Sequence, residues 1–213
     1  APRDPREITL GANVPRGGEV ETKARRELAG YHAHIEATDR AIGGLIAAAD
    51  AAAARRGRRA PIVVFTSVHG DMHGAHGLFR KGWPHEESIR VPLLVRIPAA
   101  EGNATLSFHA PRGDPVSLLD VPRWTVAWAD GAEIRMPKLG ADVQFISMPS
   151  VVALPHQCDR IWRGVRTESR KLVVDANGTP WLYFDLENDP WEMTNLASDP
   201  QRKDEIAGLR ALI

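Results

Sequence analysis

The chain has 213 residues, of which 43% are hydrophobic, and its 27 basic and 27 acidic side chains cancel to a formal net charge of zero. This length suffices for one medium domain or two small ones, and the balanced charge gives no reason to expect a nucleic-acid partner. The single cysteine excludes an internal disulfide framework, no apolar run approaches the ~20 residues that span a bilayer, and the charged first residues do not form a signal peptide. The composition therefore predicts a soluble protein that binds a small molecule, with neither nucleic acid nor membrane as partner.

The first half of the chain predicts a long helix followed by a strand. Proline and glycine punctuate residues 1–20, which indicates an irregular entry segment. From Thr22 to about Arg56, apolar side chains recur at three- and four-residue steps, so we expect one amphipathic helix, capped by Thr22 and ending before Gly57. The run Ile62–Phe65 is β-branched and aromatic and too short for a helix. It predicts a parallel strand covered on both faces, whose own parallel partner lies outside this chain.

The second half predicts further strands and two short helices. A strand is expected at Val91–Pro98, and a short helix interrupted by Pro122 within residues 114–130. Three antiparallel strands and a final helix should follow, at Trp162–Thr167, Lys171–Val174, Trp181–Leu186 and residues 201–213. The predicted fold class is α/β. Residues 1–130 form the last part of a larger α/β domain in this prediction, and residues 131–213 form a small α+β subdomain.

The segment after Phe65 contains the candidate chemistry. His69, Asp71, His73 and His76 lie within eight positions, a density typical of metal ligands, but histidines in a glycine-rich loop are more often solvated. Lys81, nearby, is either a surface amine or a point charge that binds an anion. Because hydrolysis of a sulfate or phosphate ester requires both a metal and a cation near the transferred group, the two features together favour the second interpretation.

Several stretches in order resemble the sulfatase family of the alkaline phosphatase superfamily. Residues 65–93, with His69-Gly70-Asp71, Lys81 and the strand at Val91, resemble the metal-binding loop of that family and its following strand. Residues 28–43 resemble the family's long helix, and residues 162–167 with 184–190 resemble its C-terminal subdomain. The fold that the resemblance implies is the C-terminal part of a sulfatase-like sheet with flanking helices and a small antiparallel subdomain.

The resemblance also implies roles for two residues. His69 corresponds to a ligand of the divalent metal, with calcium as the expected ion, and Lys81 corresponds to the lysine that contacts the sulfate and the leaving-group oxygen. The family's nucleophile is a formylglycine made from the Cys or Ser of a C-x-P-x-R motif. Implied partners are a sulfate or phosphate ester and, if the chain is a fragment, the missing N-terminal half.

Two departures from the family pattern argue against activity of this chain by itself. Val68 stands where the pattern has a metal-binding Asp, and an isopropyl group offers no lone pair; Asp71 follows the ligand pair and is not expected to replace it. No C-x-P-x-R motif is present, since Cys158 is followed by Asp159 and Arg160, and we expect Cys158 to be a buried thiol. The chain is therefore predicted to be inactive, either as a fragment or as a degenerate copy of a sulfuric ester hydrolase.

Two other functions remain open. The metal, histidine and lysine serve a phosphonate monoester or phosphodiester hydrolase equally well, and the loss at Val68 is compatible with a non-catalytic anion-binding or interaction module. For the remaining features we expect structural roles: residues 86–90 support the loop through salt bridges, and Trp162, Trp181 and Trp191 pack in the core or in the subdomain. An exposed apolar face is expected where strands outside the chain would pair.

Overall fold

The computed structural model describes residues 4–98, 105–108, 116–130, 142–151 and 154–213. These residues form two compact units. Residues 1–79 and 91–109 make up the first unit, and residues 80–90 and 110–213 make up the second. The segment 80–90 thus groups with the C-terminal part of the chain, although its neighbours on both sides belong to the first unit. The domain boundary expected at residue 130 stays a prediction.

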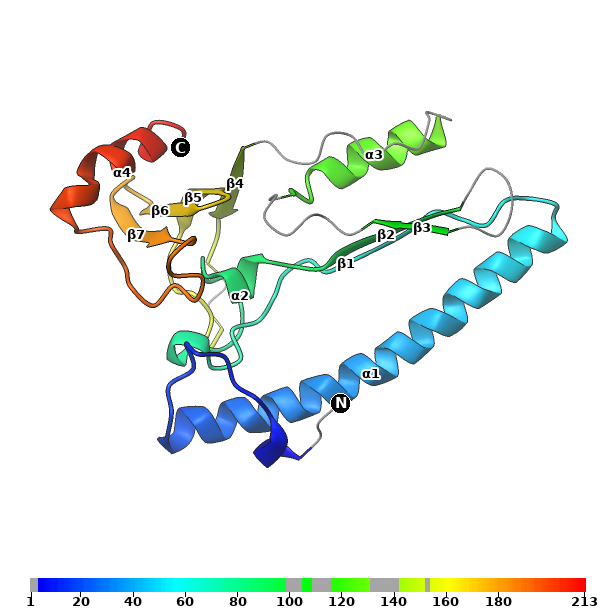
Figure 1. The fold of residues 1–213 in the computed structure, drawn as a ribbon, viewed down its shortest axis with the longest axis horizontal. Helices are drawn as coiled ribbons and strands as arrows, with labels where there is room; N and C mark the ends of the chain where they lie inside the picture. The colour runs from blue at the N-terminus through cyan, green and yellow to red at the C-terminus, as the bar shows by residue number, and fades with distance from the viewer. Residues whose placement is uncertain (1–3, 99–104, 109–115, 131–141, 152–153) are drawn as a thin grey trace. The chain divides into compact units, whose positions relative to one another are not determined.

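A 38-residue helix, α1 (Gly18–Arg55), dominates the first unit (Figure 1). It begins at Gly18, four residues before the predicted cap Thr22, and the residue at its N-cap is Gly17, whose amide donates to the Glu21 carboxylate over 2.6 Å. The Thr22 hydroxyl instead bonds back to the Gly18 carbonyl, inside the first turn. At the other end, Gly57 takes a φ of +61°, a conformation that ends helices and that glycine adopts without strain. The long helix is confirmed, and Thr22 as its cap is wrong.

The sheet of the first unit has the order β1-β2-β3 and is antiparallel throughout. Its strands are β1 (Val63–Thr66), β2 (Leu93–Pro98) and β3 (Thr105–Phe108). The prediction of a strand buried on both faces is wrong for β1, because Val63 and Val64 are only half-buried and Phe65 and Thr66 are exposed. Its one partner among the described residues is β2, which runs antiparallel. A run of β-branched residues indicates that a strand can be buried, but its burial depends on other strands or helices that cover its faces.

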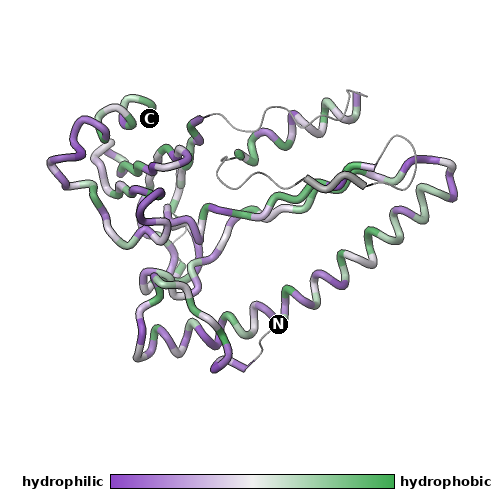
Figure 2. Tube along the Cα trace, in the orientation of Figure 1, coloured by the Kyte–Doolittle hydropathy of each residue, from purple (hydrophilic) through white to green (hydrophobic). Residues whose placement is uncertain are grey.

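Apolar surface is exposed along this unit, as expected. Only Ala24 and Ala29 of α1 are buried, while apolar side chains farther along the helix and on both strands are exposed: Tyr31, Ile35, Leu45, Phe65 and Leu94. Figure 2 shows hydrophobic positions recurring along α1 between hydrophilic ones. The core of the unit lies instead at the start of α1, where the entry segment, including the short helix η1 (Pro5–Glu7), packs on the helix through Ile8, Leu10, Val14, Ala24 and Phe79.

The second unit is built on a four-stranded antiparallel sheet of order β4-β5-β6-β7. The strands are β4 (Val143–Met148), β5 (Trp162–Thr167), β6 (Arg170–Asp175) and β7 (Pro180–Asp185), so the three predicted strands are confirmed and β4 is an addition. Alternate residues of β6 and β7 enter separate clusters: Val173, Leu182 and Phe184 in one, and Leu172, Val174 and Tyr183 in the other. Both faces of these strands are therefore covered.

Helices complete the second unit. The final helix, α4 (Lys203–Arg210), follows a turn of 3₁₀ helix, η3 (Pro200–Arg202), and contributes Ile206 to the second of those clusters. The predicted helix within residues 114–130 is α3 (Asp120–Ala129), but the interruption expected at Pro122 is wrong, because Pro122 lies in the first turn, where a missing amide donor is tolerated. A single turn, α2 (Glu86–Ile89), lies in the segment 80–90. Among the described helices, none has the length and apolar composition to cross a bilayer.

Candidate functional site

The loop after β1 orients His69. Its Nδ1 lies 2.7 Å from the Gly70 carbonyl oxygen, and the Ser67 hydroxyl donates to the His69 carbonyl over 2.8 Å. A carbonyl oxygen only accepts hydrogen bonds, so Nδ1 carries the proton and the lone pair of the neutral ring is on Nε2. This tautomer is the one in which an imidazole can bind a metal through Nε2. The local structure thus keeps His69 in a form suited to the predicted role.

The residue before His69 offers nothing to a cation. The Val68 side chain is 88% exposed, at the position where the family pattern has an Asp. Calcium takes about six to eight oxygen ligands. Among the described residues, no close group of three His, Cys, Asp or Glu side chains includes His69. The residues present therefore do not make up a calcium site, and Asp71 does not complete one: its carboxylate accepts from the His73 amide over 3.2 Å.

The rest of the loop is fixed to the first unit. Gly74 has a φ of +95°, and a Cβ built on it would lie 2.6 Å from the Cβ of Ala24 on α1. The His76 amide donates to the Asn13 carbonyl over 2.7 Å, and the His73 ring packs on Tyr31 of α1 with 4.5 Å between ring centroids. His73 and His76 both have positive φ values. These two histidines hold the loop against the entry segment and α1, so their place in the sequence cluster has a structural explanation.

Lys81 lies in the second unit, whereas His69 lies in the first. Its side chain is half-buried, and no carboxylate among the described residues pairs with its ammonium group. Its backbone carbonyl accepts a long hydrogen bond, 3.4 Å, from the Cys158 amide. A lysine without an acidic partner is available to pair with an anion from solution. The surroundings of Lys81 therefore fit the role of an anion contact.

Glu86, in the segment that follows Lys81, belongs to a buried cluster of charged side chains. The sequence analysis expected salt bridges of this segment but did not identify their partners. The Lys171 ammonium, on β6, is fully buried and contacts Glu86 Oε1 at 3.2 Å and also Glu192 Oε1. Arg166 approaches Glu86 Oε2 at 3.4 Å, and the Glu86 amide donates to Glu192 Oε2 over 2.9 Å. Residues 86–90 do form salt bridges, through Glu86, but these bonds join the segment to the C-terminal sheet, and the predicted support of the loop stays a prediction. One indication in the sequence that Lys171 is buried is that this lysine stands at the start of a predicted strand whose other residues are apolar.

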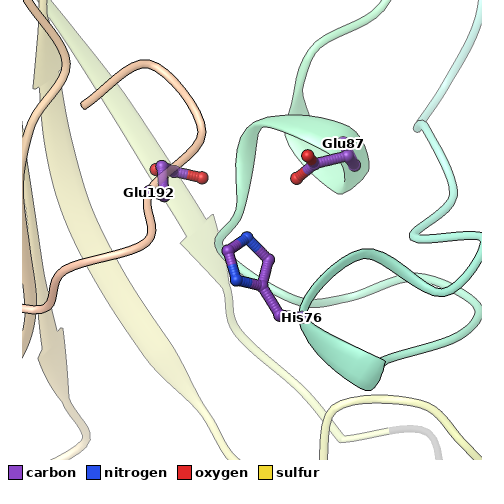
Figure 3. Close-up of side chains that lie close together, drawn as sticks. All are labelled: His76, Glu87 and Glu192. Carbon is purple, nitrogen blue, oxygen red and sulfur yellow. The ribbon is translucent and has the colours of Figure 1, made fainter. Parts of the chain in front are cut away.

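The two glutamates that contact Lys171 differ in electrostatics. Burial raises the pKa of Glu192, and the Lys171 charge opposes this shift without cancelling it. Burial also works against the charged form of Glu86, but there the charges of Lys171 and Arg166 prevail and its pKa is lowered. Glu192 and Glu87, the residue next to Glu86, are both drawn in Figure 3, together with His76 of the first unit. Two cations hold Glu86 ionised, whereas Glu192 has one.

Cys158 is a free and buried thiol, as predicted. It is 1% exposed and packs in the cluster with Trp162 and Phe184. Burial raises the pKa of this thiol, which keeps it protonated and unreactive. The predicted packing of the tryptophans is confirmed for Trp162 and for Trp181, which packs against the same cluster, whereas Trp191 is 46% exposed and is not a core residue.

Comparison with known proteins identifies the family. No family model matches the sequence. An ulvan-active sulfatase of Formosa agariphila is 32% identical over 193 residues, which are 85% of this chain and 36% of that relative. The fold is similar to that of a protein solved in complex with its substrate D-glucosamine-2-N,6-O-disulfate, with a TM-score of 0.69 at 23% identity over 92% of this chain and 42% of the other. It is also similar to the phosphonate monoester hydrolase of Agrobacterium radiobacter, with a TM-score of 0.64 at 22% identity over 90% and 42%.

The chain thus spans about a third of the length of the curated relative that it matches at 32% identity. The solved neighbours share its α/β architecture with antiparallel sheets and flanking helices. The resemblance of the loop sequence around His69 to the family agrees with these comparisons. Membership also implies a divalent metal in the family's reaction. The chain belongs to the sulfatase family of the alkaline phosphatase superfamily, and its extent is consistent with the C-terminal part of the family's proteins.

Proposed function

We propose that this chain is the part of a sulfuric ester hydrolase that carries one metal ligand, His69, and one sulfate contact, Lys81, and that it does not hydrolyse esters alone. The observation that carries the proposal is the loop at residues 67–70. There the Nδ1 proton of His69 is held by Gly70, while the neighbouring Val68 side chain is exposed without a ligand atom. One half of a ligand pair is thus in place and the other half is absent.

The substrate class that we propose is a sulfated saccharide. One relative is described as ulvan-active, and one structural neighbour holds D-glucosamine-2-N,6-O-disulfate. Both names point to a sulfate ester on a sugar, which is an anion that the unpaired ammonium of Lys81 can attract. The similarity to a phosphonate monoester hydrolase rests on the fold, so phosphonate and phosphodiester substrates stand second.

Restoring the absent ligand tests the metal half of this proposal. Val68→Asp restores a carboxylate at the position next to His69, and Mn²⁺ binding, read from paramagnetic broadening of the His69 ring signals, should tighten about tenfold or more relative to the parent chain, as expected for a charged oxygen ligand. Val68→Asn is the matched control, because it has the same size and one oxygen but no charge. Equal Mn²⁺ affinity of the two variants would contradict the metal role and favour an interaction module.

Turnover assays test the second half of the proposal, that the chain does not hydrolyse esters alone. The 213-residue chain should release no product above background from 4-methylumbelliferyl sulfate, bis(4-nitrophenyl) phosphate or a phenylphosphonate monoester, with and without Ca²⁺. Hydrolysis of any of these esters by the purified chain, sensitive to Lys81→Ala, would refute the predicted inactivity. The ester that is hydrolysed would in that case decide between sulfur and phosphorus chemistry.

A further inference from the structure

The backbone on both sides of Lys81 is held by the C-terminal sheet. The indole N–H of Trp162, on β5, donates to the Gly82 carbonyl over 2.8 Å, and the Cys158 amide approaches the Lys81 carbonyl at 3.4 Å. Trp162 is 3% exposed, and a buried indole N–H without an acceptor would be costly. The carbonyl that it meets belongs to the residue next to Lys81. The hydrogen bond thereby joins two residues that lie 80 positions apart in the sequence, and it does so next to the backbone of Lys81.

A second set of contacts fixes the same short segment from its other end. The Gly82 amide donates to the Ser88 hydroxyl over 3.1 Å, and Ser88 is buried. Gly82 has a φ of +85°, and a Cβ there would lie 3.3 Å from Met148 Cε and 3.5 Å from Cys158 Cβ. Both backbone groups of Gly82 are therefore bonded by buried side chains, in a conformation that suits glycine. The turn that carries Lys81 has little freedom.

We propose that Trp162 is a positioning residue for Lys81: its indole N–H fixes the Gly82 peptide and so keeps the lysine in one arrangement for the anion. This inference rests on the proposed function, in which Lys81 contacts the sulfate. It gives the C-terminal sheet a role in recognition beyond stability. Trp162 itself touches no substrate, and its effect passes through the backbone of Gly82.

The test measures binding of inorganic sulfate to the whole chain. The probe is the ¹⁵N signal of the Lys81 ammonium, together with the amides of residues 80–90, titrated with sulfate against chloride at equal ionic strength. Dissociation constants are read from the signals of the folded protein, so a change in the folded fraction does not enter. Lys81→Ala should abolish the saturable shifts of the amides.

Trp162→Phe keeps an aromatic ring and removes the N–H donor. Without this hydrogen bond the segment populates other backbone conformations, and the dissociation constant for sulfate should rise about fivefold, in line with one lost hydrogen bond and a smaller binding-competent fraction. Trp181→Phe is the matched control: Trp181 packs against the same cluster and makes no hydrogen bond to the segment 80–90 in the described structure, so the constant should stay within about twofold. Ser88→Ala, which removes the other bond to Gly82, should act like Trp162→Phe and serves if the latter does not fold.

The outcomes separate the two proposals. If Lys81→Ala leaves sulfate binding unchanged, the assignment of Lys81 as the anion contact fails. If Lys81→Ala abolishes binding while Trp162→Phe and Ser88→Ala behave like Trp181→Phe, the anion contact stands and the positioning role of Trp162 is overturned. A selective loss of affinity in Trp162→Phe and Ser88→Ala, with Trp181→Phe unchanged, supports the inference.

Discussion

Replacing Lys171 by Met should lower the free energy of unfolding by an amount that reports how strongly this lysine stabilises the buried ion cluster. The Lys171 ammonium is fully buried and contacts both Glu86 and Glu192. In the variant, Glu86 keeps Arg166 at 3.4 Å, but Glu192, whose side chain is 1% exposed, keeps one partner among the residues that the structure describes, the Glu86 amide. A carboxylate buried with one neutral donor has a raised pKa and takes up a proton rather than remain charged. The variant is thus expected to fold with Glu192 protonated.

The magnitude follows from the cost of that proton. The ordinary pKa of a glutamate is 4.5. Holding the group neutral costs about 1.4 kcal/mol per pH unit above this value, or about 3.4 kcal/mol at pH 7 and about 0.7 kcal/mol at pH 5. The folded-state pKa is raised, so the contribution of Glu192 to stability is complete below pH 4.5 and declines as the pH rises toward its folded-state value. The destabilisation caused by Lys171→Met should therefore grow with pH.

Urea unfolding followed by tryptophan fluorescence reports on the second unit, which contains the ion cluster, since all six tryptophans belong to that unit. Because the pKa of Glu192 is already raised in the parent chain, part of this cost is common to both proteins, and their difference should rise from below about 1.5 kcal/mol at pH 5 to at most about 3 kcal/mol at pH 7. The double variant Lys171→Met/Glu192→Gln, which has no group to protonate at that position, should lose most of this pH dependence. A cost for Lys171→Met that is the same at both pH values would refute the reasoning.

Further predictions concern the loop, the helix and a buried aspartate. Gly74→Ala should lower the melting temperature of α1, monitored by circular dichroism at 222 nm, by the equivalent of about 1–3 kcal/mol, because of the positive φ and the contact with Ala24. Gly44→Ala, where a Cβ meets nothing within 4 Å, should stabilise the same helix by about 0.5–1 kcal/mol, and equal effects of the two substitutions would contradict the packing. Burial alone would raise the pKa of Asp185, but hydrogen bonds from Asn188 and the charge of Arg170 outweigh it and lower the pKa. The contribution of Asp185 to the free energy of unfolding is thus present at neutral pH and lost as the pH falls below about 4. Asp185→Asn should therefore lower the free energy of urea unfolding by about 1–3 kcal/mol at pH 7 and by clearly less at pH 3. An equal loss at both pH values would show that the charge of Asp185 is unimportant.

The sequence by itself determined the elements whose signal is local. The apolar periodicity after Thr22 predicted α1, and the runs of β-branched and aromatic residues after residue 160 predicted β5, β6 and β7, because such side chains favour the pleated surface of a sheet. The loop motif around His69 and the lysine twelve positions later, with the strand after them, were enough to indicate the family. The absence of a ligand atom at Val68 is likewise a fact of the sequence alone.

The tertiary structure decided which parts belong together. Lys81 follows the loop of His69 closely in sequence, yet it is bound into the second unit, since the partners of its neighbours, Trp162 and Lys171, lie far along the chain. The tautomer of His69 depends on a carbonyl, and the burial of β1 depends on strands that a local pattern does not specify. Propensity and periodicity report what a residue can bury or bond. Which partner it meets is a long-range property, and only the folded chain provides it.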